Sequence, residues 1–149
     1  MVIIVIEFLF YTFFPLVLGF ISSLFSNTSL MYDGFIKPFL SPPSIIFPIV
    51  WTILYILMGL SSYKVRKDKT SMKLFYVQLT INVIWTLIFF NLRNYLQGFI
   101  LIILLIILVS LMIKRFYKIN KTAAYMNIPY LIWLIFASYL SLSIYLLNM

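Results

Sequence analysis

Cysteine and histidine are both absent from this sequence of 149 residues. Their absence excludes disulfide bonds and thiol nucleophiles, and it removes the usual ligands of zinc together with the commonest general base. Charge is also scarce, because Asp, Glu, Lys and Arg make up only 9% of the chain. The three acids, Glu7, Asp33 and Asp68, lie in different segments, so spacing brings no two carboxylates together for acid–base catalysis. We therefore expect no metal site, no required cofactor and no catalytic triad.

Apolar residues make up 64% of the sequence and give a mean hydropathy of +1.12. Soluble domains average about 45–50% apolar residues, so this composition indicates an integral membrane protein. A helix needs about 20 residues to cross a bilayer, and five apolar runs approach or exceed that length. The runs cover residues 2–25, 44–63, 74–90, 96–113 and 122–147. The sequence therefore predicts an all-α integral membrane protein, with residues 1–149 forming a single five-transmembrane-helix domain.

The first run resembles a secretory signal in its position, but it lacks a basic start and contains Glu7, so we interpret it as a retained helix. Nine of the eleven Lys and Arg lie between residues 64–73 and 114–121, on the same side of a five-span topology. The positive-inside rule places that side, with the N-terminus, in the cytoplasm. The net charge of +8 thus reflects orientation in a bilayer, and we expect no nucleic-acid partner. We expect a multi-pass protein of a bacterial cytoplasmic membrane.

The predicted external loop ends in a stiff segment, Lys37-Pro38-Phe39-Leu40-Ser41-Pro42-Pro43. Proline fixes φ and removes a backbone donor, so the shape of this segment is restricted before it packs against anything. The helix that follows carries Trp51 and Tyr55 four residues apart, hence on one face. Trp51 lies near a helix end, where an interfacial position in the headgroup belt is an alternative to a place in the bundle.

Two further runs carry stripes at helical spacing. The stripe on the third run is Gln78, Asn82, Trp85 and Phe89, and that on the fifth is Pro129, Trp133, Phe136, Ala137, Leu140 and Ser141. The two amides must face the bundle, where they bond either to other helices or to a bound molecule. The small residues of the fifth run permit either close helix packing or an unfilled space. Together, Trp51, Trp85 and Trp133 indicate an apolar pocket with a few polar groups.

Separate motifs in a fixed order support an assignment to a family. They are Lys37-Pro38 and Pro42-Pro43 in the loop; Phe47, Val50-Trp51-Thr52, Tyr55 and Met58-Gly59 in the second run; Gln78, Asn82, Trp85 and Phe89-Phe90 in the third; and Pro129-Tyr130, Trp133, Phe136-Ala137 and Leu140 in the fifth. The chain thereby resembles the translocator protein family (TspO/MBR), also called tryptophan-rich sensory proteins or peripheral benzodiazepine receptors. The resemblance implies a five-helix bundle, often a homodimer, that binds porphyrins and hydrophobic drug-like molecules beneath the first external loop.

When the family's site residues are transferred to the matching positions of this chain, the resemblance implies a set of ligand contacts and pocket walls. Tyr32, Trp51, Asn82 and Trp133 would contact the ligand, with Pro42, Pro43, Phe47, Tyr55, Trp85, Phe89 and Ala137 as walls. The chain departs from the family at Met31 and Leu40, where tryptophan is frequent, and at Ser141, where asparagine is frequent. Its Leu142 and Tyr145 are followed by no basic residue, so a proposed sterol motif is incomplete.

The leading hypothesis is a membrane receptor or carrier for porphyrins such as protoporphyrin IX. Without histidine or cysteine, conventional haem ligation is unfavourable, so a metal-free porphyrin fits better than haem. Lys37 and Arg93 would meet its propionates. One alternative, implied by the resemblance, is a light-dependent porphyrin-degrading enzyme with Trp51 and Trp133 as redox partners. The other is a small ion-coupled transporter, for which Glu7 is the one acid placed near the membrane.

Overall fold

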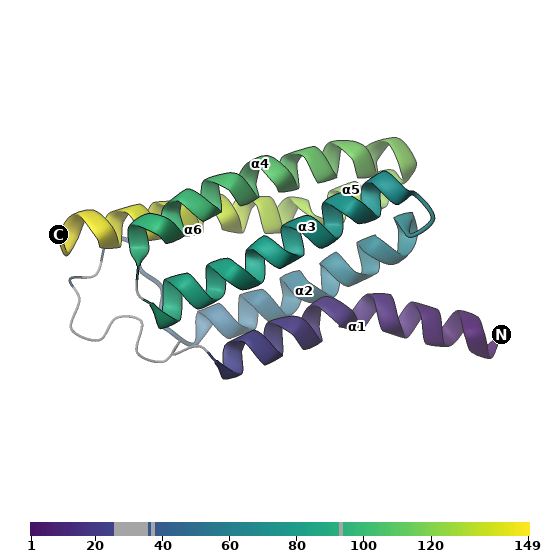
Figure 1. The fold of residues 1–149 in the computed structure, drawn as a ribbon, viewed down its shortest axis with the longest axis horizontal. Helices are drawn as coiled ribbons and strands as arrows, with labels where there is room; N and C mark the ends of the chain where they lie inside the picture. The colour runs from purple at the N-terminus through teal and green to yellow at the C-terminus, as the bar shows by residue number, and fades with distance from the viewer. Residues whose placement is uncertain (26–35, 37, 93) are drawn as a thin grey trace.

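The computed structural model describes residues 1–25, 36, 38–92 and 94–149. The described chain is helical, and five of its segments are long and apolar enough to cross a membrane (Figure 1). The elements are α1 (Val2–Leu24), α2 (Ile46–Val65), α3 (Lys69–Thr86), the π-helical η2 (Leu87–Asn91), α4 (Tyr95–Ile119), α5 (Lys121–Met126) and α6 (Ile128–Leu147). The protein is thus a multi-pass, all-α integral membrane protein, as the hydropathy pattern predicts.

Two helices extend beyond the apolar runs that predict them. α3 begins at Lys69, five residues before its apolar run, because Asp68 caps its N-terminus and accepts a hydrogen bond from the Ser71 amide at 3.0 Å. α4 continues through the basic residues to Ile119. Hydropathy detects only the part of a helix that lies in hydrocarbon, whereas polar turns continue the helix past it.

The fifth span consists of two helices, whereas its apolar run predicts one. α5 ends at Met126 and α6 begins at Ile128, with Asn127 between them. Pro129 therefore lies in the first turn of α6, where its missing N–H has no helical partner to lose. The Asn127 side chain donates to Ser61 Oγ at 2.9 Å and to the Ala123 carbonyl at 3.0 Å. The break is thus fixed to α2 by one buried hydrogen bond and to α5 by another.

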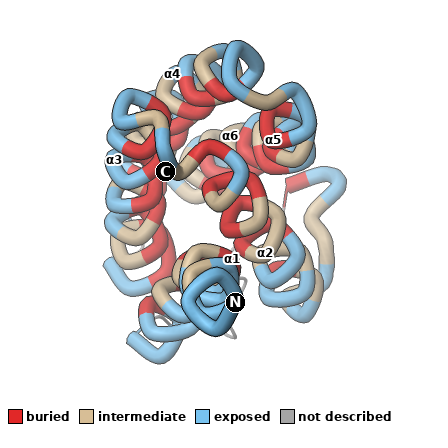
Figure 2. Tube along the Cα trace, turned by 90° about the vertical axis from the view of Figure 1, so that its right-hand side faces the viewer, coloured by how far each residue is buried: buried red, intermediate tan, exposed pale blue. Residues whose placement is uncertain are grey.

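The core lies where α2, α3, α4 and α6 face one another, as the buried positions in Figure 2 show. Many large apolar side chains are exposed on the outside. α1 packs mainly along α2 and is largely exposed, while its N-terminal end projects past the bundle (Figure 1). Gly59 permits the close approach of these two helices, because a Cβ there would lie 2.0 Å from the Thr12 carbonyl oxygen. An apolar exterior is what a lipid solvent requires.

The nine basic residues predicted to share one side of the membrane do so. They lie at the end of the bundle that holds the N-terminus and the α2–α3 and α4–α5 connections (Figure 1). The positive-inside rule assigns this end to the cytoplasm and the opposite end, with the C-terminus, to the exterior.

Candidate ligand-binding site

Trp51 stands at the meeting point of three helices. Its ring centroid lies 5.5 Å from that of Tyr55, 5.7 Å from that of Trp85 on α3 and 6.1 Å from that of Tyr130 on α6. The side chain is half-buried. These contacts place the indole against the bundle, which decides against the alternative that Trp51 only anchors the protein in the headgroup belt.

Further rings extend this contact toward the external end. Phe47 joins Trp133, 5.9 Å away, to Phe90, 6.4 Å away. Trp85 stacks on Phe89 with 5.1 Å between their centroids. We use the name aromatic cluster for eight of these connected rings: Phe47, Trp51, Tyr55, Trp85, Phe89, Phe90, Tyr130 and Trp133. Offset and edge-to-face geometries of this kind are those that aromatic rings prefer.

The π-helical segment η2 explains how two successive residues join the aromatic cluster. Phe89 and Phe90 are only 2% and 4% exposed, although neighbours on an α-helix point in different directions. The wider i→i+5 turn of a π-helix alters this angular spacing, and such segments are frequent at functional sites. A regular helix predicts Phe89 in the site but leaves the direction of Phe90 open.

A buried polar network lies beside the aromatic cluster. The Tyr55 hydroxyl donates to Asn82 Oδ1 at 2.6 Å, and Asn82 Nδ2 donates to the Tyr130 hydroxyl at 2.9 Å. Tyr130 in turn donates to Gln78 Oε1 at 2.8 Å. The polar network of Tyr55, Gln78, Asn82 and Tyr130 therefore connects α2, α3 and α6. In this structure the two amides bond between helices, which is one of the two roles open to them from the sequence.

Space for a molecule adjoins the aromatic cluster on two sides. Between α1 and α2, cavities of about 70 and about 150 Å³ share the lining residues Gly19, Ser23, Pro48, Trp51 and Tyr55. Between α2 and α6 a groove of about 620 Å³ is lined by Val50, Ile53, Leu54, Pro129, Ile132, Trp133 and Phe136. Pockets for small molecules are typically about 300–1,000 Å³, and among these three spaces the groove reaches that size.

Two indole N–H groups are buried without an acceptor among the described residues, those of Trp85 and Trp133. The Trp85 nitrogen lies beside α4, since a Cβ at Gly98 would be 3.6 Å from it. A buried donor without a partner costs about 1–3 kcal/mol, more than a typical hydrogen bond contributes. Trp133 also lines the groove between α2 and α6. A ligand with an acceptor oxygen at that ring would remove the penalty.

The external loop is described only in part. Pro42 is half-buried and Pro43 exposed just before α2, while Ala137 is buried on α6. The predictions for Tyr32, Met31, Lys37 and Arg93 lie outside the described residues. Nearer α2, the loop is attached to the end of α6: the Ile36 amide donates to Asn148 Oδ1 at 2.9 Å, and Asn148 Nδ2 donates back to the Ile36 carbonyl at 3.2 Å.

Three residues of the observed site, Tyr130, Phe90 and Gly19, are not among the site residues predicted from the sequence. Tyr130 carries a usable signal, because it precedes Trp133 by three residues and so shares a helix face with it. Gly19 carries none, although it makes room for the site: a Cβ there would be 2.3 Å from Tyr55 Cε2.

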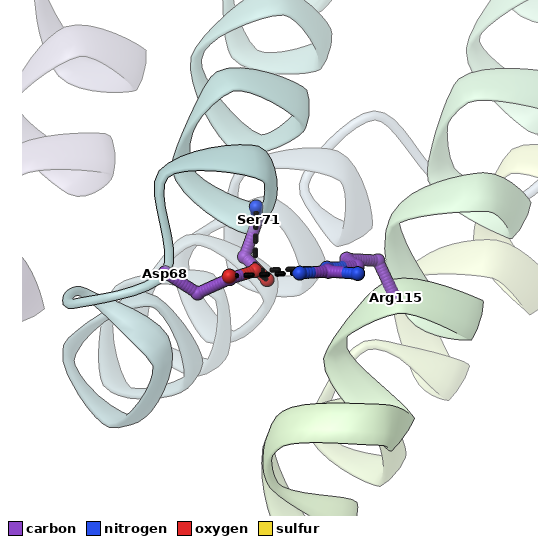
Figure 3. A network of polar contacts seen from close by, with 3 residues as sticks. All are labelled: Asp68, Ser71 and Arg115. Carbon is purple, nitrogen blue, oxygen red and sulfur yellow. Dashed lines mark hydrogen bonds and ion pairs between the residues drawn. The ribbon is translucent and has the colours of Figure 1, made fainter.

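The two acids in the described chain lie at the cytoplasmic end, away from the aromatic cluster. Glu7 Oε1 is 2.7 Å from Arg66 Nε. Asp68 binds Arg115 through both carboxylate oxygens at 2.9 Å each, and it also accepts from the Ser71 hydroxyl at 2.6 Å (Figure 3). These hydrogen bonds, first that from Arg115 and then those from Ser71, hold the pKa of Asp68 well below its usual value of 3.8.

Comparison with known proteins gives consistent results. A family model described as "TspO/MBR family" matches residues 11–147. The chain is 40% identical to "Tryptophan-rich protein TspO" of Archaeoglobus fulgidus, across 89% of this chain and 91% of that protein. It is 38% identical to the protein of the same name from Chlorobaculum tepidum, across 89% and 90%. It is 32% identical to the human "Translocator protein", across 74% and 70%.

Proposed function

The chain belongs to the TspO/MBR family, and from this membership we propose that it is a membrane receptor or carrier for porphyrins and other flat hydrophobic molecules. The ligand would be held by the aromatic cluster where α2, α3 and α6 meet. The observation that carries the proposal is the convergence of Trp51, Trp85 and Trp133 from three helices onto one set of contacting rings.

The chemistry of the aromatic cluster suits a flat, polarizable ligand. Each added offset-stacked or edge-to-face aromatic pair contributes about 0.5–1.5 kcal/mol beyond the burial of area. The groove beside Trp133 has the volume, and the buried Trp133 N–H supplies a donor for an oxygen of the ligand. Carboxylates at the rim of a porphyrin are acceptors of this kind, and we propose Lys37 and Arg93 as their cationic partners on the external side.

In this proposal the polar network holds rings of the aromatic cluster in position and also offers contacts to the ligand. Asn82 uses its oxygen on Tyr55 and its nitrogen on Tyr130, so it fixes both phenols against Trp51. Predicted as a ligand contact, Asn82 serves as a positioning residue in this geometry. Pre-set rings reduce the conformational entropy that binding removes.

We propose binding without required cofactor or catalysis. Both described acids are held in ion pairs at the cytoplasmic end, remote from the rings. This arrangement also supports a carrier or receptor over an ion-coupled transporter, because Glu7 is engaged with Arg66. Light-dependent breakdown of a bound porphyrin is the alternative, and illumination of the same complex tests it.

The test is a titration of the purified, reconstituted protein with protoporphyrin IX in the dark, followed by tryptophan fluorescence. In a Trp51→Ala, Trp133→Ala variant Trp85 remains as the reporter, and the dissociation constant should rise about tenfold or more through loss of two stacking partners. Tyr125→Phe, an exposed site on α5, is the matched control and should bind like the wild type. Absence of saturable quenching in the wild type, or equal constants in the double variant, contradicts the proposal.

Illumination of the same complexes separates binding from catalysis. A carrier gives slow bleaching that is equal in wild type and in Trp51→Phe, Trp133→Phe, provided both are saturated with porphyrin. A defined product that forms only with the wild type would show catalysis and replace the carrier proposal.

A further inference from the structure

Arginine and lysine have different roles at the cytoplasmic end. Arg66 takes Glu7 and Arg115 takes Asp68, and both arginines are half-buried. The guanidinium fork matches a carboxylate with two parallel hydrogen bonds, as Arg115 shows on Asp68 (Figure 3). Both acidic residues at this end are therefore engaged in ion pairs. One pair joins α1 to the end of α2, and the other joins the start of α3 to α4.

The lysines are left as a uniform positive surface. Seven lysines are exposed at this end, and neither ion pair of the described chain includes one of them. We call this set the lysine face: Lys64, Lys67, Lys69, Lys73, Lys114, Lys118 and Lys121. Because two arginines cancel two acids, the side chains at this end carry seven positive charges without a compensating carboxylate.

The depth of the lysine face is fixed by short connections. Three residues separate the end of α2 at Val65 from the start of α3 at Lys69, and only Asn120 separates α4 from α5. The lysines therefore stay within about one or two helical turns of the apolar spans, at the level of the headgroups.

Tyrosines give an independent mark of that level. Tyr117 and Tyr125 are exposed with ring centroids 6.1 Å apart, and the Lys121 ammonium lies 5.4 Å from the centre of the Tyr117 ring. Exposed tyrosine beside lysine is typical of the membrane interface, where the ring sits among headgroups and the lysine stem extends along apolar surface.

We propose that the lysine face binds the phosphate groups of anionic phospholipids in the cytoplasmic leaflet. Clusters of several lysines directly beside membrane spans attract anionic lipid, whereas a zwitterionic headgroup offers no net charge to them. The ammonium group is a compact point charge with three donors and suits a phosphate oxygen from many directions. The partner is thus a lipid class, and the site is separate from the aromatic cluster at the other end of the bundle.

The proposal is tested by native mass spectrometry of the protein released from detergent containing equal amounts of phosphatidylglycerol and phosphatidylcholine. The wild type should retain phosphatidylglycerol in preference. Replacing Lys64, Lys67, Lys114 and Lys118 by glutamine should reduce the preference by about fivefold per lysine that contacts lipid at low ionic strength. Replacing the same four by arginine keeps the charge and should preserve the preference.

The remaining outcomes show whether the lipid preference is electrostatic and whether the bound phosphate belongs to a lipid or to a soluble anion. Added salt should weaken the preference, because exposed charges are screened. Inorganic phosphate that competes with the lipid at equal concentration would show a site for soluble anions and overturn the lipid assignment. An unchanged preference in the glutamine variant overturns the proposal, provided that variant shows the wild-type helical circular dichroism and melting temperature.

Discussion

Tyr130 occupies the middle of the buried polar network, because its hydroxyl accepts from Asn82 and donates to Gln78. Tyr130→Phe keeps the ring but leaves a buried amide donor and a buried amide acceptor without this partner. We expect the free energy of unfolding in detergent to fall by about 1–2 kcal/mol, at the upper end for hydrogen bonds between membrane helices. Tyr125→Phe is the exposed control, and equal losses in the two variants would show that the polar network contributes nothing.

Asp68 makes the stability of the cytoplasmic end depend on pH. Its pKa is lowered in the folded protein, chiefly by hydrogen bonding from Arg115, so the stabilisation is complete above the ordinary value of 3.8 and decreases as pH falls below it. We expect Asp68→Asn to melt at a lower temperature than the wild type at pH 7. The difference should shrink progressively below about pH 4, and a difference that is constant down to strong acid would contradict the assignment.

Helical spacing predicts only part of what the site residues do. Helical spacing predicts that Gln78, Asn82, Trp85 and Phe89 share a face, and all four are buried. Spacing does not reveal partners, so it left open whether Asn82 bonds to another helix or to a ligand. The hydrogen bonds to Tyr55 and Tyr130 depend on α2 and α6 arriving at the same depth, which is a property of the assembled bundle.

At the scale of the helices, Gly59 on α2 lets that helix approach the backbone of α1 closely. A methyl group at Gly59 would meet the backbone of Thr12, which cannot rotate away, whereas at Gly98 it would meet the Phe89 side chain at 3.2 Å. We expect Gly59→Ala to destabilise the protein by about 1–3 kcal/mol and to move α1 outward. Gly98→Ala, where a side chain can yield, should cost less, as thermal unfolding of the two variants will show; the reverse order would refute the contact.

The sequence predicts some boundaries of the helices but not others. All five spans follow from apolar length, and Asp68 at the start of α3 is a recognisable cap once the helix is known to begin there. The break at Asn127 and the π-helical turn at Leu87–Asn91 did not follow, because both lie inside apolar runs and depend on contacts with other helices. Both changes set the direction of site residues, Phe90 in one case and Tyr130 in the other.

At the scale of the whole molecule, the lysine face and the aromatic cluster lie toward opposite ends. The lysine face and both described ion pairs lie at the end that holds the N-terminus, while the aromatic cluster extends toward the external end. This polarity follows from the sequence, since the placement of Lys and Arg needs only the number of spans. The attachment of the loop to the C-terminus does not follow, because the residues that make it are 112 positions apart.

The attachment of the loop to the end of α6 can be tested by removing the Asn148 side chain. The Asn148 side chain pairs with both backbone groups of Ile36, as a neighbouring strand would, and Tyr139 donates to the Phe39 carbonyl. In Asn148→Ala the Ile36 amide loses its acceptor, so its hydrogen exchange should accelerate by about tenfold or more if the bond contributes about 1.5 kcal/mol. Tyr139→Phe is the matched control, because it removes a donor to a carbonyl three residues away and should leave the Ile36 amide protected. If Asn148→Ala leaves the exchange rate unchanged, the loop is held by other contacts.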